Sequence, residues 1–398
     1  MPNTTPLGRQ RAIVAAAFFV QGLLFISLTT RLPVISQRFD LTELVLSGLM
    51  LMMVLLAGAG SVLAERISIQ RSSAAVVRLA LGLLAVGVAV MGLGVRPGSG
   101  LALFVAGLAV YGLGVGTMDA ASNMQAVGVE HAAGRTLLPS FHAAWTFGGI
   151  VATVLALATG DALGWLGALL LTGCTLVLLA LPFPRWHAPP PSADTESVGV
   201  PWRPILMIGL ALVVFYMVDT ATTAWGPLYL ASDKVFDDPA SSAGLYALAT
   251  LPYLVATLLA RVVGDDATSR FGPVSVVRGA ALATAAGLAV VVFAPTWPVA
   301  VLGFFVVGLG ISVIAPLSFS AAGRLAGEVD PALRQRRIDA VIARFNQFNY
   351  VGALLGSVLT GAIGKDNLRI GYAVPLVLVF ALLPLARHFA APREPAAA

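Results

Sequence analysis

The sequence has very few charged residues. Only 11% of its 398 residues are Asp, Glu, Lys or Arg, whereas soluble domains carry roughly 25%. Hydrophobic residues make up 58% of the chain, and the mean hydropathy is +0.90. A chain of this composition has too few charges to cover an ordinary water-exposed surface, so we expect an integral membrane protein.

Cysteine is nearly absent, and several catalytic motifs are missing. The single cysteine, Cys174, excludes an intramolecular disulfide and a thiolate metal cluster. The chain has no G-x-x-x-x-G-K-[ST] phosphate loop, no H-E-x-x-H motif and no G-x-S-x-G motif. These absences argue against an ATP-driven pump, a metalloprotease and a serine hydrolase. We therefore expect no enzyme activity, no cofactor and no bound metal.

Long apolar segments recur along the whole chain. A hydrocarbon layer of about 30 Å requires about twenty apolar residues in a helix. We expect an all-α membrane protein with twelve transmembrane helices in two pseudo-symmetric six-helix bundles. The bundles are expected at 1–183 and 204–398, joined by a proline-rich cytoplasmic linker at 184–203. The predicted spans are 12–30, 44–63, 79–95, 101–124, 139–159, 163–183, 204–230, 242–263, 275–294, 298–322, 341–363 and 371–388.

The two halves carry matching fragments in the same order. The pairs are Glu65 and Asp265, Val76-Val77-Arg78 and Val276-Val277-Arg278, Gly112-Leu113-Gly114 and Gly308-Leu309-Gly310, and Phe141 with Gly148 and Phe345 with Gly352. A two-fold repeat of this length in a very apolar chain is typical of a duplicated membrane transporter.

Basic residues indicate the topology. With both termini inside, 18 of the 24 Lys and Arg residues fall in cytoplasmic segments, including Arg261 at the end of the eighth span. This bias follows the positive-inside rule and predicts a multi-pass protein of the cytoplasmic (inner) membrane with both termini cytoplasmic. The pI of 9.7 thus reflects topology and does not indicate a nucleic-acid partner.

Two stretches resemble a known family. One runs from Gly116-Thr117-Met118-Asp119 to Gln125 and continues with Leu138-Pro139-Ser140-Phe141-His142, and the other contains Gly264-Asp265 and Arg270-Phe271-Gly272-Pro273. They resemble the major facilitator superfamily, and within it the bacterial MosC/YbjJ-like branch. The resemblance implies two six-helix bundles around a central cavity, with alternating access by rocking of the halves.

The resemblance also implies gating residues. The family's loop signature G-x-L-x-D-R-x-G-R corresponds here to the stretch around Glu65-Arg66, which lacks both glycines and the last arginine. The loop in the second half keeps Gly264, Asp265, Arg270 and Gly272. Glu65, Arg66, Asp265 and Arg270 are the gating residues that follow from this match.

Two acids lie well inside predicted spans. Insertion of an ionised carboxylate there costs at least about 2.5–3.5 kcal/mol, so Asp119 and Asp219 are candidate functional residues. Desolvation disfavours the charged form, which suits an acid that gains and loses a proton during transport. The alternative is a protonated or hydrogen-bonded acid that only holds helices together.

Other polar residues recur at helical spacing inside the spans. Aromatic side chains with polar tips and amides suit neutral polyols, sugars or zwitterions. Bonding between helices is the alternative for each of them. The candidate substrate-binding residues are Gln21, Asn123, His142, Trp145, Tyr216, Thr223, Tyr246, Tyr253, Asn346 and Asn349.

These features predict a secondary active transporter of a small organic solute. We expect proton coupling through Asp219 and Asp119, and a monomer whose partners are the solute, protons and the lipid bilayer. A proton-antiport drug exporter is an alternative, although the stretch 145–153 lacks the proline of the family's antiporter signature. A non-transporting membrane sensor or scaffold is a further alternative.

The topology is testable with reporter fusions after Pro191 and at the carboxyl terminus. Because most basic residues fall in the segments assigned to the cytoplasm, both reporters should be cytoplasmic. An external reporter at either position would contradict the twelve-span arrangement.

Overall fold

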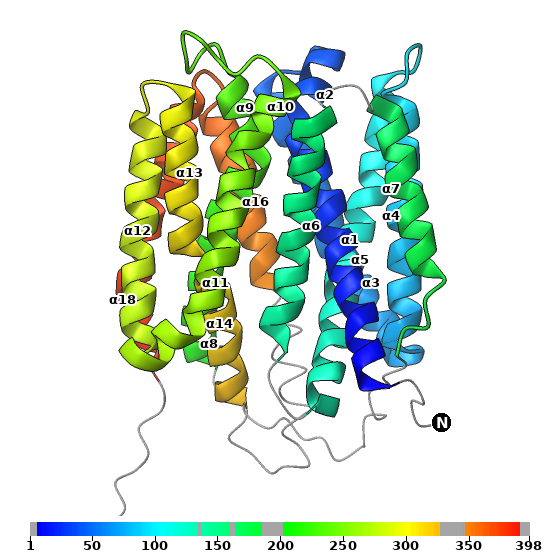
Figure 1. The fold of residues 1–398 in the computed structure, drawn as a ribbon, viewed down its shortest axis with the longest axis vertical. Helices are drawn as coiled ribbons and strands as arrows, with labels where there is room; N and C mark the ends of the chain where they lie inside the picture. The colour runs from blue at the N-terminus through cyan, green and yellow to red at the C-terminus, as the bar shows by residue number, and fades with distance from the viewer. Residues whose placement is uncertain are drawn as a thin grey trace, which may run out of the picture.

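The computed structural model describes residues 6–133, 137–159, 164–184, 202–326, 345 and 347–390, and these are almost entirely helical (Figure 1). The linker at 185–201 and Asn346 lie outside the described residues. The first half contains α1 (Leu7–Thr30), α2 (Leu32–Phe39), α3 (Glu43–Gln70), α4 (Ser73–Gly94), α5 (Leu101–Ala133), α6 (Leu138–Thr159) and α7 (Gly164–Leu179). The second half contains α8 (Trp202–Thr220), η1 (Ala221–Trp225), α9 (Gly226–Ala231), α10 (Ala243–Tyr246), η2 (Ala247–Ala249), α11 (Leu251–Phe271), α12 (Pro273–Phe293), α13 (Trp297–Ile311), α14 (Ile314–Ala326), α16 (Gln347–Ile363), α17 (Leu368–Leu378), η3 (Val379–Ala381), α18 (Leu382–Leu385) and η4 (Ala386–Phe389).

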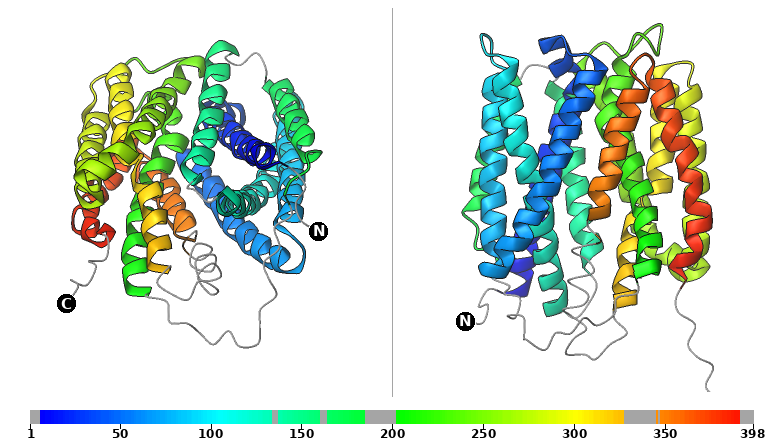
Figure 2. Two further views of the ribbon diagram at one scale, coloured as in Figure 1. Left: turned by 60° about the horizontal axis from the view of Figure 1, so that its bottom comes forward. Right: turned by 180° about the vertical axis from the view of Figure 1, so that it is seen from behind.

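The predicted fold class is confirmed. Within the described ranges, ten helical segments are long and apolar enough to cross a membrane, and α7 is a shorter apolar helix. The helix α16 occupies the place of the eleventh predicted span. Seen from one end, the helices up to α7 gather on one side and those from α8 onward on the other (Figure 2).

Helix ends differ from the predicted spans. The helices α3 and α5 continue to Gln70 and Ala133, well past the apolar residues that marked their spans. At 1.5 Å per residue, the 33 residues of α5 extend about 50 Å, so this helix projects beyond the hydrocarbon layer. The short helix α2 was not predicted, because hydropathy detects membrane-spanning segments and α2 is only eight residues long.

The sequence repeat corresponds to repeated helix contacts. A Cβ at Gly112 of α5 would meet the backbone of Met53 in α3, and a Cβ at Gly308 of α13 would meet the backbone of Tyr253 in α11. In the same way, Gly148 of α6 lies against α1, and Gly352 of α16 lies against α8. The retained glycines therefore mark close backbone approach at equivalent helix pairs in both bundles.

Prolines interrupt three helices of the second bundle. A proline has no N–H, so it leaves the carbonyl four residues earlier without its helical donor. Pro227 follows the π-helix η1, Pro252 follows the 3₁₀ turn η2, and Pro316 lies just after the break between α13 and α14. These irregular segments adjoin the polar residues described below.

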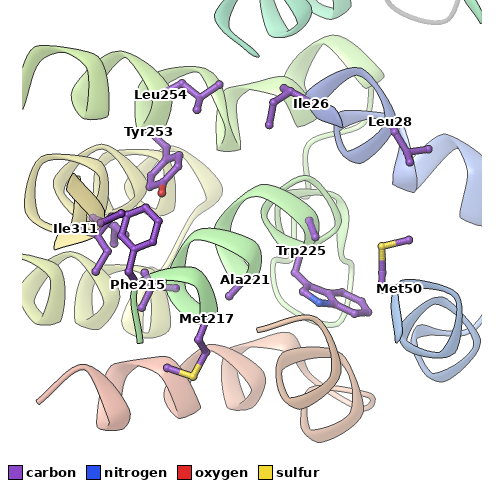
Figure 3. Close-up of a cluster of buried hydrophobic side chains, with 14 of the residues drawn as sticks. Ile26, Leu28, Met50, Phe215, Met217, Ala221, Trp225, Tyr253, Leu254 and Ile311 are labelled. Atoms are coloured by element: carbon purple, nitrogen blue, oxygen red, sulfur yellow. The ribbon is translucent and has the colours of Figure 1, made fainter. Parts of the chain in front are cut away.

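The two bundles contact each other along several helices. In addition to contacts of α3 with α16 and of α6 with α11, α2 packs against α9 at one end of the molecule (Figure 1). Lys234 pairs with Glu43 across the bundles at 3.3 Å near this end. Trp225 donates its indole N–H to the Ser357 carbonyl at 2.9 Å and is directed toward Met50 of α3 (Figure 3). Packing thus closes the interface near α2 and α9.

The glycine contacts can be tested with Gly148→Ala and Gly352→Ala. Each added methyl group would meet the backbone of the facing helix, and overpacking of this kind typically destabilises a protein by about 1–3 kcal/mol. Both variants should have a lower Tm in detergent, measured by circular dichroism. Gly82→Ala is the matched control, because nothing lies within 4 Å of the added atom. Its Tm should stay the same or rise, since alanine favours helices by about 1 kcal/mol over glycine. Equal behaviour of all three variants would contradict the packing account.

Candidate functional site

A cavity lies between the two bundles. Its empty volume is about 1130 Å³, which includes space open to solvent. Helices α1, α3, α5 and α6 form one wall, and α8, η1, α11 and α16 form the other. Its polar and charged lining residues are Gln21, Asp119, His142, Trp145, Tyr216, Asp219, Thr220, Arg261, Asn349, Tyr350 and Ser357.

Asp219 lies in the last turn of α8, next to the π-helix. The Tyr253 hydroxyl donates a hydrogen bond of 2.5 Å to its carboxylate Oδ1. Thr223, one turn later, donates to the backbone carbonyl of Asp219 at 2.8 Å. Figure 3 shows Tyr253 projecting from α11 toward the side chains of α8. The break at Pro252 and the π-helix together place this acid and its tyrosine donor side by side, and π-bulges are frequent at functional sites.

Arg261 of α11 lies in the cavity, so its predicted place among the cytoplasmic basic residues is wrong. It lines the cavity wall and interacts electrostatically with Asp219. Its Nη1 donates to the Thr146 hydroxyl of the opposite bundle at 2.8 Å, and its Nε donates to the Ser312 carbonyl at 3.4 Å. The backbone carbonyl of Ser312 is the one that Pro316, four residues later, leaves without a helical donor.

A signal for Arg261 is present in the sequence. Tyr246, Thr250, Tyr253 and Thr257 form a polar stripe at helical spacing, and four more residues along the same face lead to Arg261. A positive charge near the end of a predicted span is usually a topology determinant. The continuation of the stripe is the feature that distinguishes this arginine.

Asp119 of α5 faces the same cavity from the first bundle. The Tyr350 hydroxyl of α16 donates to its carboxylate Oδ2 at 3.2 Å, so this hydrogen bond crosses the bundle interface. Asn123 and Ser122 both donate to the backbone carbonyl of Asp119, at 2.9 and 3.2 Å. Asn123 therefore lies beside the acid but outside the cavity lining.

Aromatic side chains of the first bundle form an apolar part of the wall. His142 packs edge-on against Phe18 with ring centroids 5.4 Å apart, and Trp145 lies 6.1 Å from the Phe25 ring. Asn349, on the opposite wall, is 4% exposed. An aromatic surface thus faces amide and phenol groups across the cavity.

The structure brings together seven of the sixteen predicted site residues in the cavity lining: Gln21, Asp119, His142, Trp145, Tyr216, Asp219 and Asn349. Thr223 and Tyr253 are buried and bond to Asp219, whereas Tyr246 is buried in α10 away from the lining.

Of the predicted gating residues, Glu65 and Arg66 belong to α3 and Asp265 and Arg270 to α11. Arg66 and Arg270 are exposed. Within the described ranges, no three His, Cys, Asp or Glu side chains form a group able to hold a metal ion.

Comparison with known proteins supports a family assignment. The sequence profile described as the Major Facilitator Superfamily matches residues 140–357. An uncharacterised MFS-type transporter of Yersinia pestis is 27% identical in an alignment of 394 residues that covers 95% of each chain. The membrane protein MosC of Rhizobium meliloti is 25% identical in an alignment of 345 residues that covers 81% of this chain and 78% of MosC.

Solved structures show the same fold at low sequence identity. A mutant form of the nucleoside transporter NupG has a TM-score of 0.69 and 16% identity, covering 96% of this chain and 98% of NupG. The transporter FucP in its outward conformation has a TM-score of 0.65 and 18% identity, with the same coverage. Because the profile matches more than half of the sequence and the fold agrees over nearly its whole length, the chain belongs to the major facilitator superfamily and is a secondary transporter.

Proposed function

We propose that the protein couples the movement of a small polar organic solute to protons, with Asp219 as the coupling acid. The observation that carries this proposal is the position of the Asp219 carboxylate in the central cavity, bonded by Tyr253 and beside Arg261. Relatives with this fold include the fucose:proton symporter FucP of E. coli.

The surroundings of Asp219 suit two protonation states. Without partners, an ionised carboxylate at this depth costs about 2.5–3.5 kcal/mol on insertion scales. Attraction to Arg261 and the hydrogen bond from Tyr253 offset part of that cost in the charged state. In the neutral state, Arg261 keeps its bonds to Thr146 and Ser312. In both protonation states of Asp219, the polar groups around it therefore have bonding partners, as a site that binds a proton reversibly requires.

Asp119 is proposed as a second titrating group that senses the position of the bundles. Its bond from Tyr350 crosses the interface, so any rocking of the bundles changes the neighbourhood of this acid. Loss of the Tyr350 hydrogen bond removes a partner of the charged form. The protonation of Asp119 would thereby be coupled to the opening of the interface between the bundles.

The opposite walls of the cavity suit a solute with one apolar face. Trp145 offers a ring surface, while Asn349 and Tyr216 offer amide and phenol groups from the other bundle. Solutes of such transporters bind at the interface of the repeats, near the membrane midplane. We propose that the apolar face of the solute stacks on Trp145 and that its polar groups bond to Asn349.

The gating proposal rests on the ends of α3 and α11. Glu43 pairs with Lys234 at one end of the interface, and Arg66 lies 23 residues later in α3, about 35 Å along the helix. This distance supports a position for Glu65 and Arg66 at the opposite side of the hydrocarbon layer. We propose that this side is cytoplasmic, that both termini lie there in the inner membrane, and that Glu65, Arg66, Asp265 and Arg270 close it in the alternate state.

Export of an amphipathic compound is a second candidate function. Much of the cavity wall is apolar, formed by Phe18, Phe25, Met50, Met53 and Phe215, and methionine side chains adapt to varied ligands. Proton symport and proton antiport move the solute in opposite directions under the same imposed proton gradient, so proteoliposome transport distinguishes this exporter from a symporter.

The coupling role predicts the behaviour of Asp219→Asn. A solute would first be identified by thermal stabilisation of the purified protein across a solute library. In proteoliposomes, the variant should lose proton-driven accumulation but retain solute exchange, because the amide imitates the neutral acid. Asp40→Asn is the matched control, since Asp40 is an exposed acid at the end of α2, and it should accumulate solute like the wild type. Accumulation against a gradient by Asp219→Asn would reject the assignment.

The binding role predicts the behaviour of Asn349→Ala and Trp145→Ala. Loss of one hydrogen bond typically costs about 0.5–1.5 kcal/mol, so Asn349→Ala should raise the Kd of the solute about two- to tenfold. Trp145→Ala should raise it at least as much, because it removes a whole ring surface. Titration calorimetry measures both. Trp202→Ala, at the exposed start of α8, is the control and should bind normally. Unchanged affinity in both cavity variants would move the site elsewhere.

A further inference from the structure

A second cavity lies entirely within the first bundle. Its empty volume is about 1480 Å³, which includes space open to solvent, and its walls come from α1, α2, α4, α5, α6 and α7. It shares no lining residue with the central cavity. Gln21 and Phe25 of α1 face the central cavity, whereas Leu24, Leu28 and Arg31 face the second one, so α1 separates the two.

The lining of the second cavity is apolar except at one end. Arg31 and Arg38 line that end, next to α2. Arg38 donates to the backbone carbonyl of Arg96 at 3.3 Å, and the Arg96 guanidinium lies 5.6 Å from the Trp165 ring. Two arginines therefore line this rim, and the backbone of a third, Arg96, adjoins them.

These arginines lie on the side where the positive-inside rule disfavours them. Of the other basic residues predicted on that side, Lys234 pairs with Glu43, and Arg369 donates to the carbonyls of Val292 and Val235. Lys234 thus joins the two bundles, and Arg369 joins segments within the second bundle. Arg31 and Arg38 differ from those two residues in lining a large cavity, and guanidinium groups at the rim of a cavity suit an anionic ligand.

The length of the cavity matches a lipid chain. Along α7, the lining extends from Gly164 to Cys174, ten residues or about 15 Å. Leu155 and Leu170 of the lining are 46% and 63% exposed on the bundle surface, so the cavity opens sideways toward the bilayer. Ser27 and Thr159 are the main polar groups besides the arginines. A small polar solute would find few hydrogen-bonding partners in this part of the cavity, whereas an acyl chain needs none.

We propose that this cavity binds an anionic phospholipid. Its phosphate lies between Arg31 and Arg38, because a guanidinium forms charge-assisted hydrogen bonds to phosphate oxygens. One acyl chain runs inward along α7 and ends near Cys174. The site is independent of the transported solute and of proton coupling. It supports α1, whose other face borders the central cavity.

The only cysteine of the chain reports on this site without any mutation. Cys174 is exposed and lines the inner end of the cavity. Purified protein would be incubated with phosphatidylglycerol, with phosphatidylcholine or with oleate. Its alkylation by N-ethylmaleimide would then be followed by mass spectrometry. Phosphatidylglycerol should slow alkylation several-fold more than either other lipid. Equal protection by phosphatidylcholine would overturn the role of the arginines, and equal protection by oleate would overturn the phospholipid assignment.

Variants of the arginines complete the test. Arg38→Gln, at an exposed position, and the double variant Arg31→Gln/Arg38→Gln should each need more phosphatidylglycerol for half protection. For Arg38→Gln the expected increase is about tenfold, equivalent to about 1.4 kcal/mol. Lys365→Gln is the control, because Lys365 is an exposed cation of the second bundle, and it should be protected like the wild type. Unfolded protein is recognised by rapid alkylation in every lipid. Arg38→Gln that folds normally and is fully protected would overturn the proposal.

Discussion

The lack of water inside a bilayer is the constraint on which this structure depends. Every backbone N–H and C=O at that depth needs a partner within the protein, which explains why the described spans are helices. At one break, a side chain supplies the donor that a proline removes. Pro316 leaves the Ser312 carbonyl to Arg261. The irregular segment η1 is held in a similar way, since Tyr372 donates to the Ala221 carbonyl at 2.7 Å. The breaks in the helices thus bring polar side chains to the cavity.

Between the two halves of the repeat, residues that pack helices together match, whereas residues that line the cavity differ. Gly148 and Gly352 stayed alike because each allows a close approach of two helices at equivalent places. Trp145 and Asn349 occupy matched positions one turn earlier on these helices, yet both line the cavity and differ completely in chemistry. The glycine contacts of the two bundles therefore correspond to each other, whereas the two walls of the cavity differ. An asymmetric cavity suits an asymmetric solute.

Hydropathy and periodicity predicted the helices, because burial in lipid leaves a long apolar signal. They predicted Asp219 and Asp119 for the complementary reason, since a charge inside such a segment is conspicuous. Arg261 was misplaced because a helix can break and tilt, and sequence alone does not show how deep the end of a span lies. The partner of Asp119 was equally out of reach, since Tyr350 is 231 residues away in the sequence. This pair depends on how the two bundles dock, which no local pattern encodes.

The strength of the contacts differs within and between the bundles. Within a bundle, helices approach so closely at glycines that a single methyl group does not fit, and such packing resists deformation. At the cavity, the bundles are joined by single hydrogen bonds, from Arg261 to Thr146 and from Tyr350 to Asp119. Each bond involves a charged group and contributes about 1.5–3 kcal/mol net. The Lys234–Glu43 pair is partly exposed, and pairs of this kind contribute about 0–1 kcal/mol. Rigid bundles that are joined around the cavity by a few polar contacts can separate there, which is part of the motion that alternating access requires.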